Sequence, residues 1–246
     1  MGAVSFSIDV ELIKVLRMMI SFDAFVETGT FKGDTVDSIK DLFGSIYSVE
    51  LSEKYYEEAM NRFLGIEHIR LYQGESSEVL HDVATALRDQ SVLYFLDAHW
   101  CVANSTAGEL SQCPLLGEIE AINQLNEKSL VIIDDARLFL APPLAPHEIS
   151  QWPSFDEVLI QLRKLSPSHC IMVLNDTIIF YPKRLEHALQ DYGQRHGTDW
   201  LDVLHKVRDY DNLREQFNGL LQQLHERDEA LKKFSRGGFI SRFFRS

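Results

Sequence analysis

The stretch FVETGTFKG, residues Phe25–Gly33, places a carboxylate between an apolar segment and a turn that contains two glycines. An apolar strand, a glycine turn and a helix in succession are typical of the start of an open α/β sheet, where ligands bind at the carboxyl ends of the strands. A dinucleotide site would need the spacing G-x-G-x-x-G, whereas three residues separate Gly29 from Gly33. The stretch therefore predicts a ligand-binding turn of a different kind.

Glu27 lies at the mouth of this turn, where it would repel a phosphate group. Two like charges ~4 Å apart repel by roughly 4 kcal/mol at an effective dielectric constant of about 20. The same carboxylate would attract a cofactor that carries an ammonium and a sulfonium group, and S-adenosylmethionine carries both. Glu27 therefore indicates a cationic cofactor at the end of the first strand.

Short apolar runs alternate with helical stretches along most of the chain, which is typical of a parallel, doubly wound α/β sheet. Only Asn175 and Asp176 separate the last two runs, and so short a link joins antiparallel neighbours. We therefore expect seven strands, the last one antiparallel, at residues 24–27, 46–51, 69–73, 92–97, 130–134, 170–174 and 177–181. Helices are expected at 32–42, 52–64, 76–88, 115–125 and 155–165.

Composition excludes several classes of protein. The net charge of −13 argues against a nucleic-acid partner, which would need a broad basic surface. Three scattered cysteines are too few for a disulfide framework and favour a reducing cytoplasm. No stretch approaches the ~20 consecutive apolar residues of a membrane span.

Two further strand ends carry acidic residues. Glu50 follows Gly29 by 21 residues and ends the second strand, where a carboxylate can accept hydrogen bonds from ribose hydroxyls. Glu75 and Ser76 follow the third strand, where an acid can meet the amino group of adenine. Acids at three consecutive strand ends favour an adenosyl cofactor over isolated surface charges.

Five motifs in order carry a resemblance to a known family: FVETGTFKGDTV, IYSVELSEKYYEEAMNRF, IRLYQGESSEVL, LYFLDAHW and LVIIDDARLF. Over residues 20–182 the chain resembles class I S-adenosylmethionine-dependent methyltransferases, and among them the branch found with bacterial polysaccharide and O-antigen biosynthesis. The resemblance implies a Rossmann-like sheet and a cofactor site lined by Glu27, Gly29, Phe31, Gly33, Glu50, Glu75 and Asp97. The neighbouring Thr28, Thr30 and Ser76 complete the predicted site. The family usually has Gly-Asp where this chain has Gly74-Glu75, which weakens the assignment of Glu75.

The motifs LDAHW and IDDAR end the fourth and fifth strands and bring candidate catalytic groups to the same edge. Methyl transfer to a sugar hydroxyl needs a base or a metal, because the pKa of that hydroxyl lies far above neutrality. His99 is the expected general base, oriented by Asp97 or Asp135.

The alternative for the same edge is a metal centre. Asp97, Asp134 and Asp135 would then bind Mg²⁺ or another divalent ion, which would lower the pKa of the acceptor hydroxyl. Trp100 and Arg137 are expected to contact the substrate in either case.

We expect three segments: a methyltransferase domain at 1–199, a coiled-coil helix at 200–235 and a tail at 236–246. In the helix, apolar residues recur every seven positions, which favours a homo-oligomer; the alternative is a helix packed on its own domain. The first row consists of Val203, Tyr210, Phe217, Leu224 and Leu231. A second row lies three positions after the first and contains Leu213, Leu220 and Phe234, with Lys206 and Arg227 as interruptions.

Residues 232–246 combine five basic side chains with phenylalanines and contain no acid. Such a segment suits peripheral contact with an anionic membrane, here the cytoplasmic membrane; docking on a protein partner is the alternative. The function expected from sequence is an O-methyltransferase acting on a sugar hydroxyl of a bacterial surface glycan, which would cap the chain. A non-catalytic scaffold that recruits a glycosyltransferase to the membrane is the competing hypothesis.

Overall fold

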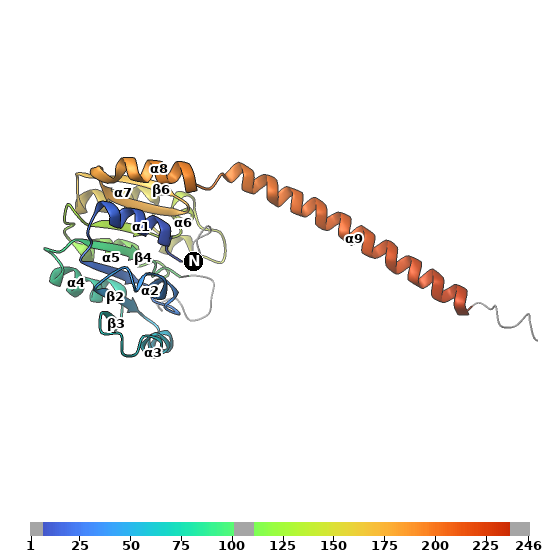
Figure 1. Cartoon of the computed structure of the whole chain (residues 1–246), viewed down its shortest axis with the longest axis horizontal. Coiled ribbons are helices and arrows are strands. Elements are labelled where there is room, and N and C mark those ends of the chain that lie inside the picture. The colour runs from blue at the N-terminus through green and yellow to red at the C-terminus, as the bar shows by residue number, and fades with distance from the viewer. Residues whose placement is uncertain (1–6, 101–110, 237–246) are drawn as a thin grey trace, which may run out of the picture. The chain divides into compact units, whose positions relative to one another are not determined.

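The computed structural model describes residues 7–100 and 111–236. The chain divides into two compact units, Met1–Gly197 and Thr198–Ser246. The first unit contains the sheet and the second contains the long helix α9 (Trp200–Arg236) (Figure 1).

The first unit is built on a seven-stranded sheet in the order β3-β2-β1-β4-β5-β7-β6. Strands β1 to β5 pair in parallel, and β7 runs antiparallel to both β5 and β6. The sheet confirms the doubly wound, seven-stranded fold with an antiparallel last strand. The strands are β1 (Ala24–Thr28), β2 (Ile46–Glu50), β3 (Ile69–Gln73), β4 (Val92–Leu96), β5 (Leu130–Ile133), β6 (His169–Leu174) and β7 (Thr177–Pro182).

The turn between β6 and β7 is the two-residue hairpin expected from the sequence. Leu174 pairs with Thr177, so Asn175 and Asp176 alone form the loop. Both loop residues have positive φ angles, 49° and 67°, as a type I′ turn requires. Asn and Asp tolerate this conformation better than most residues, which is why the pair can reverse the chain here.

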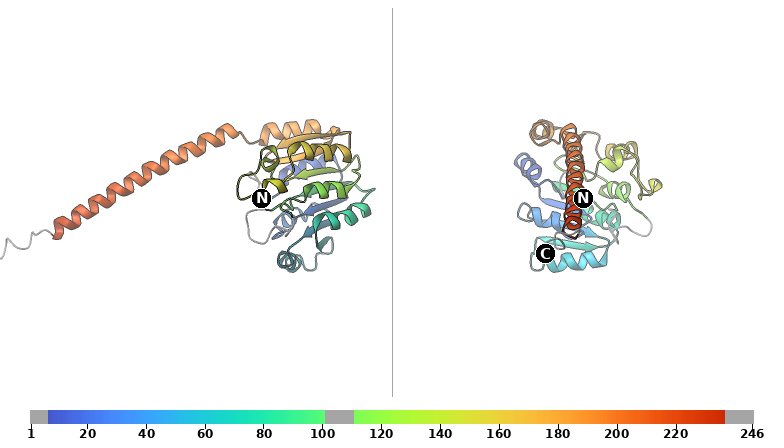
Figure 2. Two further views of the ribbon diagram at one scale, coloured as in Figure 1. Left: turned by 180° about the vertical axis from the view of Figure 1, so that it is seen from behind. Right: turned by 90° about the vertical axis from the view of Figure 1, so that its right-hand side faces the viewer.

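Helices cover both faces of the sheet, as the two views in Figure 2 show. Side chains alternate along β4: Leu93 and Phe95 join one core, and Tyr94 and Leu96 join the other. The first core packs under α1 (Val10–Met19), α2 (Asp34–Ile39), α3 (Glu53–Arg62) and α8 (Glu186–His196). The second packs under α4 (Ser76–Ala86), α5 (Leu115–Ile122) and α7 (Phe155–Leu165). Short helical turns are α6 (Arg137–Leu140), η1 (Ile149–Gln151) and η2 (Lys183–Leu185).

The helix α8 was not expected from the sequence. Its mean hydropathy is low, and only Leu189 and Tyr192 within it are buried, together with Leu185 just before it. These residues follow the spacing i, i+4, i+7 and place one narrow stripe against the sheet. The stripe is readable in the sequence once the end of β7 is known.

The turn after β1 depends on Gly29, whose φ is +85°. A Cβ at this position would lie 2.3 Å from the carbonyl oxygen of Asp97, a distance that side-chain carbons do not tolerate. The end of β4 therefore packs directly against the backbone of the turn, and only glycine allows this approach.

We expect Gly29→Ala to destabilise the protein by more than about 3 kcal/mol, because it adds backbone strain to a clash with rigid backbone atoms. Urea unfolding would measure the loss. Gly44→Ala is the matched control, since no atom lies within 4 Å of its Cβ position. Equal stability of the two variants would contradict the close approach.

The helix α9 has 37 residues, and its large apolar side chains are exposed in the single chain. Among the residues that the structure describes, no helix has the length and apolar character needed to cross a bilayer. The predicted tail spans residues 236–246, and apart from Arg236 it lies outside the described residues.

Candidate functional site

The candidate site lies at the carboxyl edge of the sheet, where the strand order reverses between β1 and β4. Ligands of open α/β sheets bind at this switch point. Glu27 and Thr28 end β1, Glu50 ends β2, and Asp97 directly follows β4. The topology therefore brings residues from distant motifs to one edge.

Glu27 is buried, with 1% of its surface exposed. Its Oε2 accepts a hydrogen bond of 2.5 Å from the Ser48 hydroxyl, which in turn lies 2.6 Å from the hydroxyl of Thr30. Its Oε1 has no hydrogen-bond partner among the described residues. Burial raises the pKa of Glu27 to about 8, and the bond from Ser48 offsets only part of that rise. This carboxyl group is poised to ionise when a cation arrives.

Glu50 holds the turn after β1 in place. Its Oε2 accepts the backbone N–H of Phe31 at 2.7 Å, and its Oε1 accepts the N–H of Ser52 at 2.8 Å. Phe31 has a positive φ of 47°, and its ring packs on Tyr55 at 4.4 Å between centroids. Burial raises the pKa of Glu50 despite these hydrogen bonds. Each carboxylate oxygen retains a second lone pair for a ligand.

Glu75 has a local structural role that the sequence reasoning did not assign. It is the N-cap of α4, and its Oε2 accepts from the N–H of Glu78 at 3.0 Å and from the hydroxyl of Ser77 at 2.5 Å. Such capping explains an acid at this position without a ligand. The adjacent Ser76 is buried at the same helix start.

His99 lies at the centre of a buried cluster after β4. Its Nε2 is 3.0 Å from Oδ2 of Asp135, and its Nδ1 is 3.8 Å from Oδ1 of Asp97. Its ring contacts the edges of Trp152 and Phe139 at centroid distances of 5.6 and 6.4 Å. The structure therefore brings together the predicted base and both aspartates that were candidates to orient it.

Of these two aspartates, Asp135 is the better placed to orient the ring of His99, because it lies within hydrogen-bond distance. It is buried and has a positive φ of 54°, so the backbone is held in a sparsely populated conformation. Burial opposes its ionisation, yet the hydrogen bond with His99 and the nearby Arg137 leave its pKa below the ordinary value. A charged Asp135 keeps the proton of His99 on Nε2 and leaves Nδ1 as the basic nitrogen.

Arg137 connects this cluster to the β6–β7 turn. Its Nη1 donates to Oδ1 of Asp135 at 2.6 Å and forms an ion pair with Asp176, which also accepts the backbone N–H of Arg137 at 2.8 Å. The predicted substrate residue Arg137 therefore stabilises the site from within. Trp100, the other predicted substrate residue, is half-buried and packs edge-on against His147 at 5.3 Å.

The predicted metal centre is not supported. Within residues 7–100 and 111–236, no group of three or more His, Cys, Asp or Glu side chains is arranged to hold an ion. Asp135 is already bonded to His99 and Arg137. Asp134 differs from it in protonation, because burial and the charge of Asp135 raise the pKa of Asp134 to about 6. For Asp97, burial and the charge of Asp134 raise the pKa well above its ordinary value.

Glu118 is a site residue that the sequence reasoning missed. It lies on α5 with 1% of its surface exposed, near Ser76 and Thr28, and burial raises its pKa to about 7. Its Oε1 has no hydrogen-bond partner among the described residues. The signal was present: Glu118 occupies the apolar stripe of its helix, three residues after Leu115.

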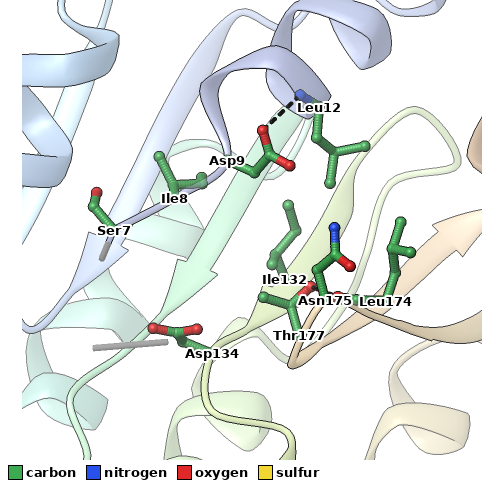
Figure 3. Close-up of a pocket in the computed structure, with 9 residues that line it drawn as sticks. All are labelled: Ser7, Ile8, Asp9, Leu12, Ile132, Asp134, Leu174, Asn175 and Thr177. Atoms are coloured by element: carbon green, nitrogen blue, oxygen red, sulfur yellow. Dashed lines mark hydrogen bonds between the residues drawn. The ribbon is translucent and has the colours of Figure 1, made fainter. Parts of the chain in front are cut away.

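A small pocket lies beside the end of β5, close to Asp134 (Figure 3). It is enclosed by Asp9, the N-cap of α1, by Leu12 on α1, by Ile132 on β5 and by Asn175 in the hairpin turn. Its volume of about 20 Å³ holds about one water molecule. This pocket is too small for a sugar ring, so an acceptor would have to approach the cluster around His99 from another side.

The sequence matches no family model, and it matches no curated protein. Among solved structures the chain is similar to a protein described as a caffeoyl-CoA O-methyltransferase from Staphylococcus aureus, at 17% identity, with 71% of this chain and 84% of that chain covered and a TM-score of 0.48. It is also similar to a S-adenosylmethionine-dependent methyltransferase from Clostridium acetobutylicum, at 11% identity, with 70% and 88% covered and a TM-score of 0.45. These identities and scores are too low to assign an activity, so any function has to be argued from this chain's own residues.

Proposed function

We propose that this chain is a S-adenosylmethionine-dependent O-methyltransferase that acts on a sugar hydroxyl, of the kind found in bacterial surface glycans. The observation that carries the proposal is Glu27, a buried carboxyl at the switch point of the sheet with a pKa raised to about 8. An isolated buried carboxylate is costly, and a cationic ligand is the partner that offsets the cost.

The residues present fit this cofactor. Glu27 would bind the ammonium group, and the remaining lone pairs of Glu50 would accept the ribose hydroxyls. The turn at Gly29 would line the cofactor site, because it directly follows Glu27 on β1 and is held by Glu50 through the N–H of Phe31. When bound, S-adenosylmethionine supplies a methyl group on a positively charged sulfur.

His99 is the proposed general base. With its Nε2 proton held by Asp135, Nδ1 can take the proton of the acceptor hydroxyl as the oxygen attacks. The imidazolium that forms is stabilised by the charged Asp135 at 3.0 Å. The enzyme otherwise contributes alignment of the two reacting groups.

Calorimetric titration with S-adenosylmethionine and with S-adenosylhomocysteine tests the cofactor directly. We expect both to bind, and radiolabelled methyl transfer to a panel of free sugars and glycan extracts would then identify the acceptor. Absence of binding at millimolar ligand would contradict the proposal and favour the scaffold hypothesis.

We expect Glu50→Ala to weaken cofactor binding by about 2–3 kcal/mol, roughly 30- to 150-fold in Kd, because ribose loses a charged acceptor and the turn at Phe31 loses its support. Calorimetry at constant pH would measure the change. Glu57→Ala, an exposed glutamate on the following helix, is the matched control and should bind like the wild type. An unchanged Kd for Glu50→Ala would remove Glu50 from the site.

A further inference from the structure

The helix α9 presents a continuous apolar row to solvent in the single chain. The side chains of Tyr210, Leu213 and Leu224 are 63%, 65% and 61% exposed. A row of this length, on a helix of ~55 Å, is far larger than the apolar surface a monomer normally leaves open. Its members are Val203, Tyr210, Leu213, Phe217, Leu220, Leu224 and Leu231.

From Arg208 onward the opposite side of α9 is polar, whereas Leu201 and Leu204 are exposed apolar residues on that side near its start. Asp211, Asn212, Glu215, Gln222 and Glu226 lie away from the apolar row in the seven-residue repeat. A helix that is apolar on one narrow stripe and polar elsewhere buries that stripe against another helix, since a fully buried helix would be apolar all round. The row has the spacing of a and d positions, with a at Val203 and d at Leu213.

We propose that the partner is α9 of a second copy of this chain, aligned in parallel and in register. In such a pair, each g position faces the e position of the next heptad on the other helix. Asp209 is at g and Arg214 is at e, so Asp209 of each copy faces Arg214 of the other. Two neighbouring helices therefore gain two ion pairs, one from Asp209 of each copy to Arg214 of the other.

An antiparallel pair with Phe217 facing Leu220 loses this match. The g positions then face one another, as do the e positions. Asp209 would face Ala230, and Arg214 would face Leu221. Relative to this antiparallel register, the charge pattern favours the parallel arrangement.

Two cations, Lys206 and Arg227, interrupt the d positions, and in an in-register pair each faces its own copy at a cost in stability. Lys206 is neutralised within its own helix by Asp202 at 2.6 Å, and Arg227 is followed by Asp228 at the adjoining e position. Between the two cations the seam is apolar from Tyr210 to Leu224. A shift by one heptad would place Lys206 opposite Leu213 and Arg227 opposite Leu220, so it would shorten the uninterrupted apolar seam.

The first test is the mass of the full-length chain by analytical ultracentrifugation. We expect a multiple of 28.3 kDa for the wild type and 28.3 kDa for the double variant Leu213→Asp, Leu220→Asp. The matched control, Asn212→Asp with Gln222→Asp on the polar side, should keep the wild-type mass. A wild-type chain that stays at 28.3 kDa at tens of micromolar would overturn the proposal, whether α9 packs on its own domain or awaits a different partner.

The second test addresses orientation by exchanging charges. Asp209→Arg and Arg214→Asp should each weaken association by about tenfold or more, because like charges then face each other at both edges. The double variant should recover to within a few-fold of the wild type. Recovery supports the parallel register, and failure to recover overturns it. Circular dichroism of each variant would establish that the helix itself is retained.

Discussion

Replacing Glu27 with glutamine is expected to stabilise the free protein at pH 8 while impairing cofactor binding. The pKa of Glu27 is about 8 in the folded chain against an ordinary value of 4.5, so the folded state binds the extra proton between these pH values. Stability therefore falls as the pH rises from 4.5 to 8, by an amount on the order of 4 kcal/mol. Glutamine is neutral throughout, keeps an acceptor for Ser48 and avoids this loss.

Binding should move in the opposite direction. An ammonium group loses a charged acceptor in Glu27→Gln, which is expected to weaken binding by about 10- to 150-fold. Binding to the wild type should also release a proton below pH 8, since the cation favours the ionised carboxyl. Titration in buffers of different ionisation enthalpy measures this proton release, and urea unfolding at pH 5 and pH 8 measures the stability.

Glu118→Gln is the matched control for the stability measurement. Glu118 is equally buried and has a pKa of about 7, so its replacement should also stabilise the protein at pH 8. Because Glu118 lies near Thr28 in the candidate site, it is a control for stability alone, and the exposed Glu57→Gln is the control for binding, which should stay within a few-fold of the wild type. Undiminished affinity in Glu27→Gln would contradict the proposed ammonium site.

His99→Ala is expected to lower kcat by about 100-fold or more and to leave the Kd of S-adenosylmethionine nearly unchanged. The base acts on the acceptor alone, so only the chemical step loses its contribution. Asp135→Asn should produce a smaller loss in the same direction, because the asparagine no longer fixes the proton on Nε2. Single-turnover methyl transfer and calorimetry separate the two effects.

The matched control is His81→Ala, an exposed histidine on α4 that should retain full activity. If activity instead disappears with EDTA, returns with Mg²⁺ and survives in His99→Ala, the base mechanism is wrong and a metal carries the reaction.

Much of the fold is readable in the sequence because its signals are local. Apolar runs of strand length, separated by helical stretches, specify a sheet covered on both faces, and the structure contains all seven strands within about one residue of their expected ends. The two-residue link at Asn175 and Asp176 was enough to reverse the last strand. The acids at the ends of β1 and β2 were also visible, since parallel strands bring their carboxyl ends to one edge.

Tertiary packing decided the rest, because it joins residues that are far apart in the chain. His99 meets Asp135 across 36 residues, and Arg137 meets Asp176 across 39. These contacts engage Asp135 with His99 and Arg137, residues that the sequence alone had left open to either a base or a metal role. Burial, which no local pattern measures, raises the pKa of Glu27 and Glu118. The sequence thus sufficed for elements whose hydrogen bonds and apolar periodicity are local, whereas the protonation and pairing of buried groups depended on the three-dimensional environment.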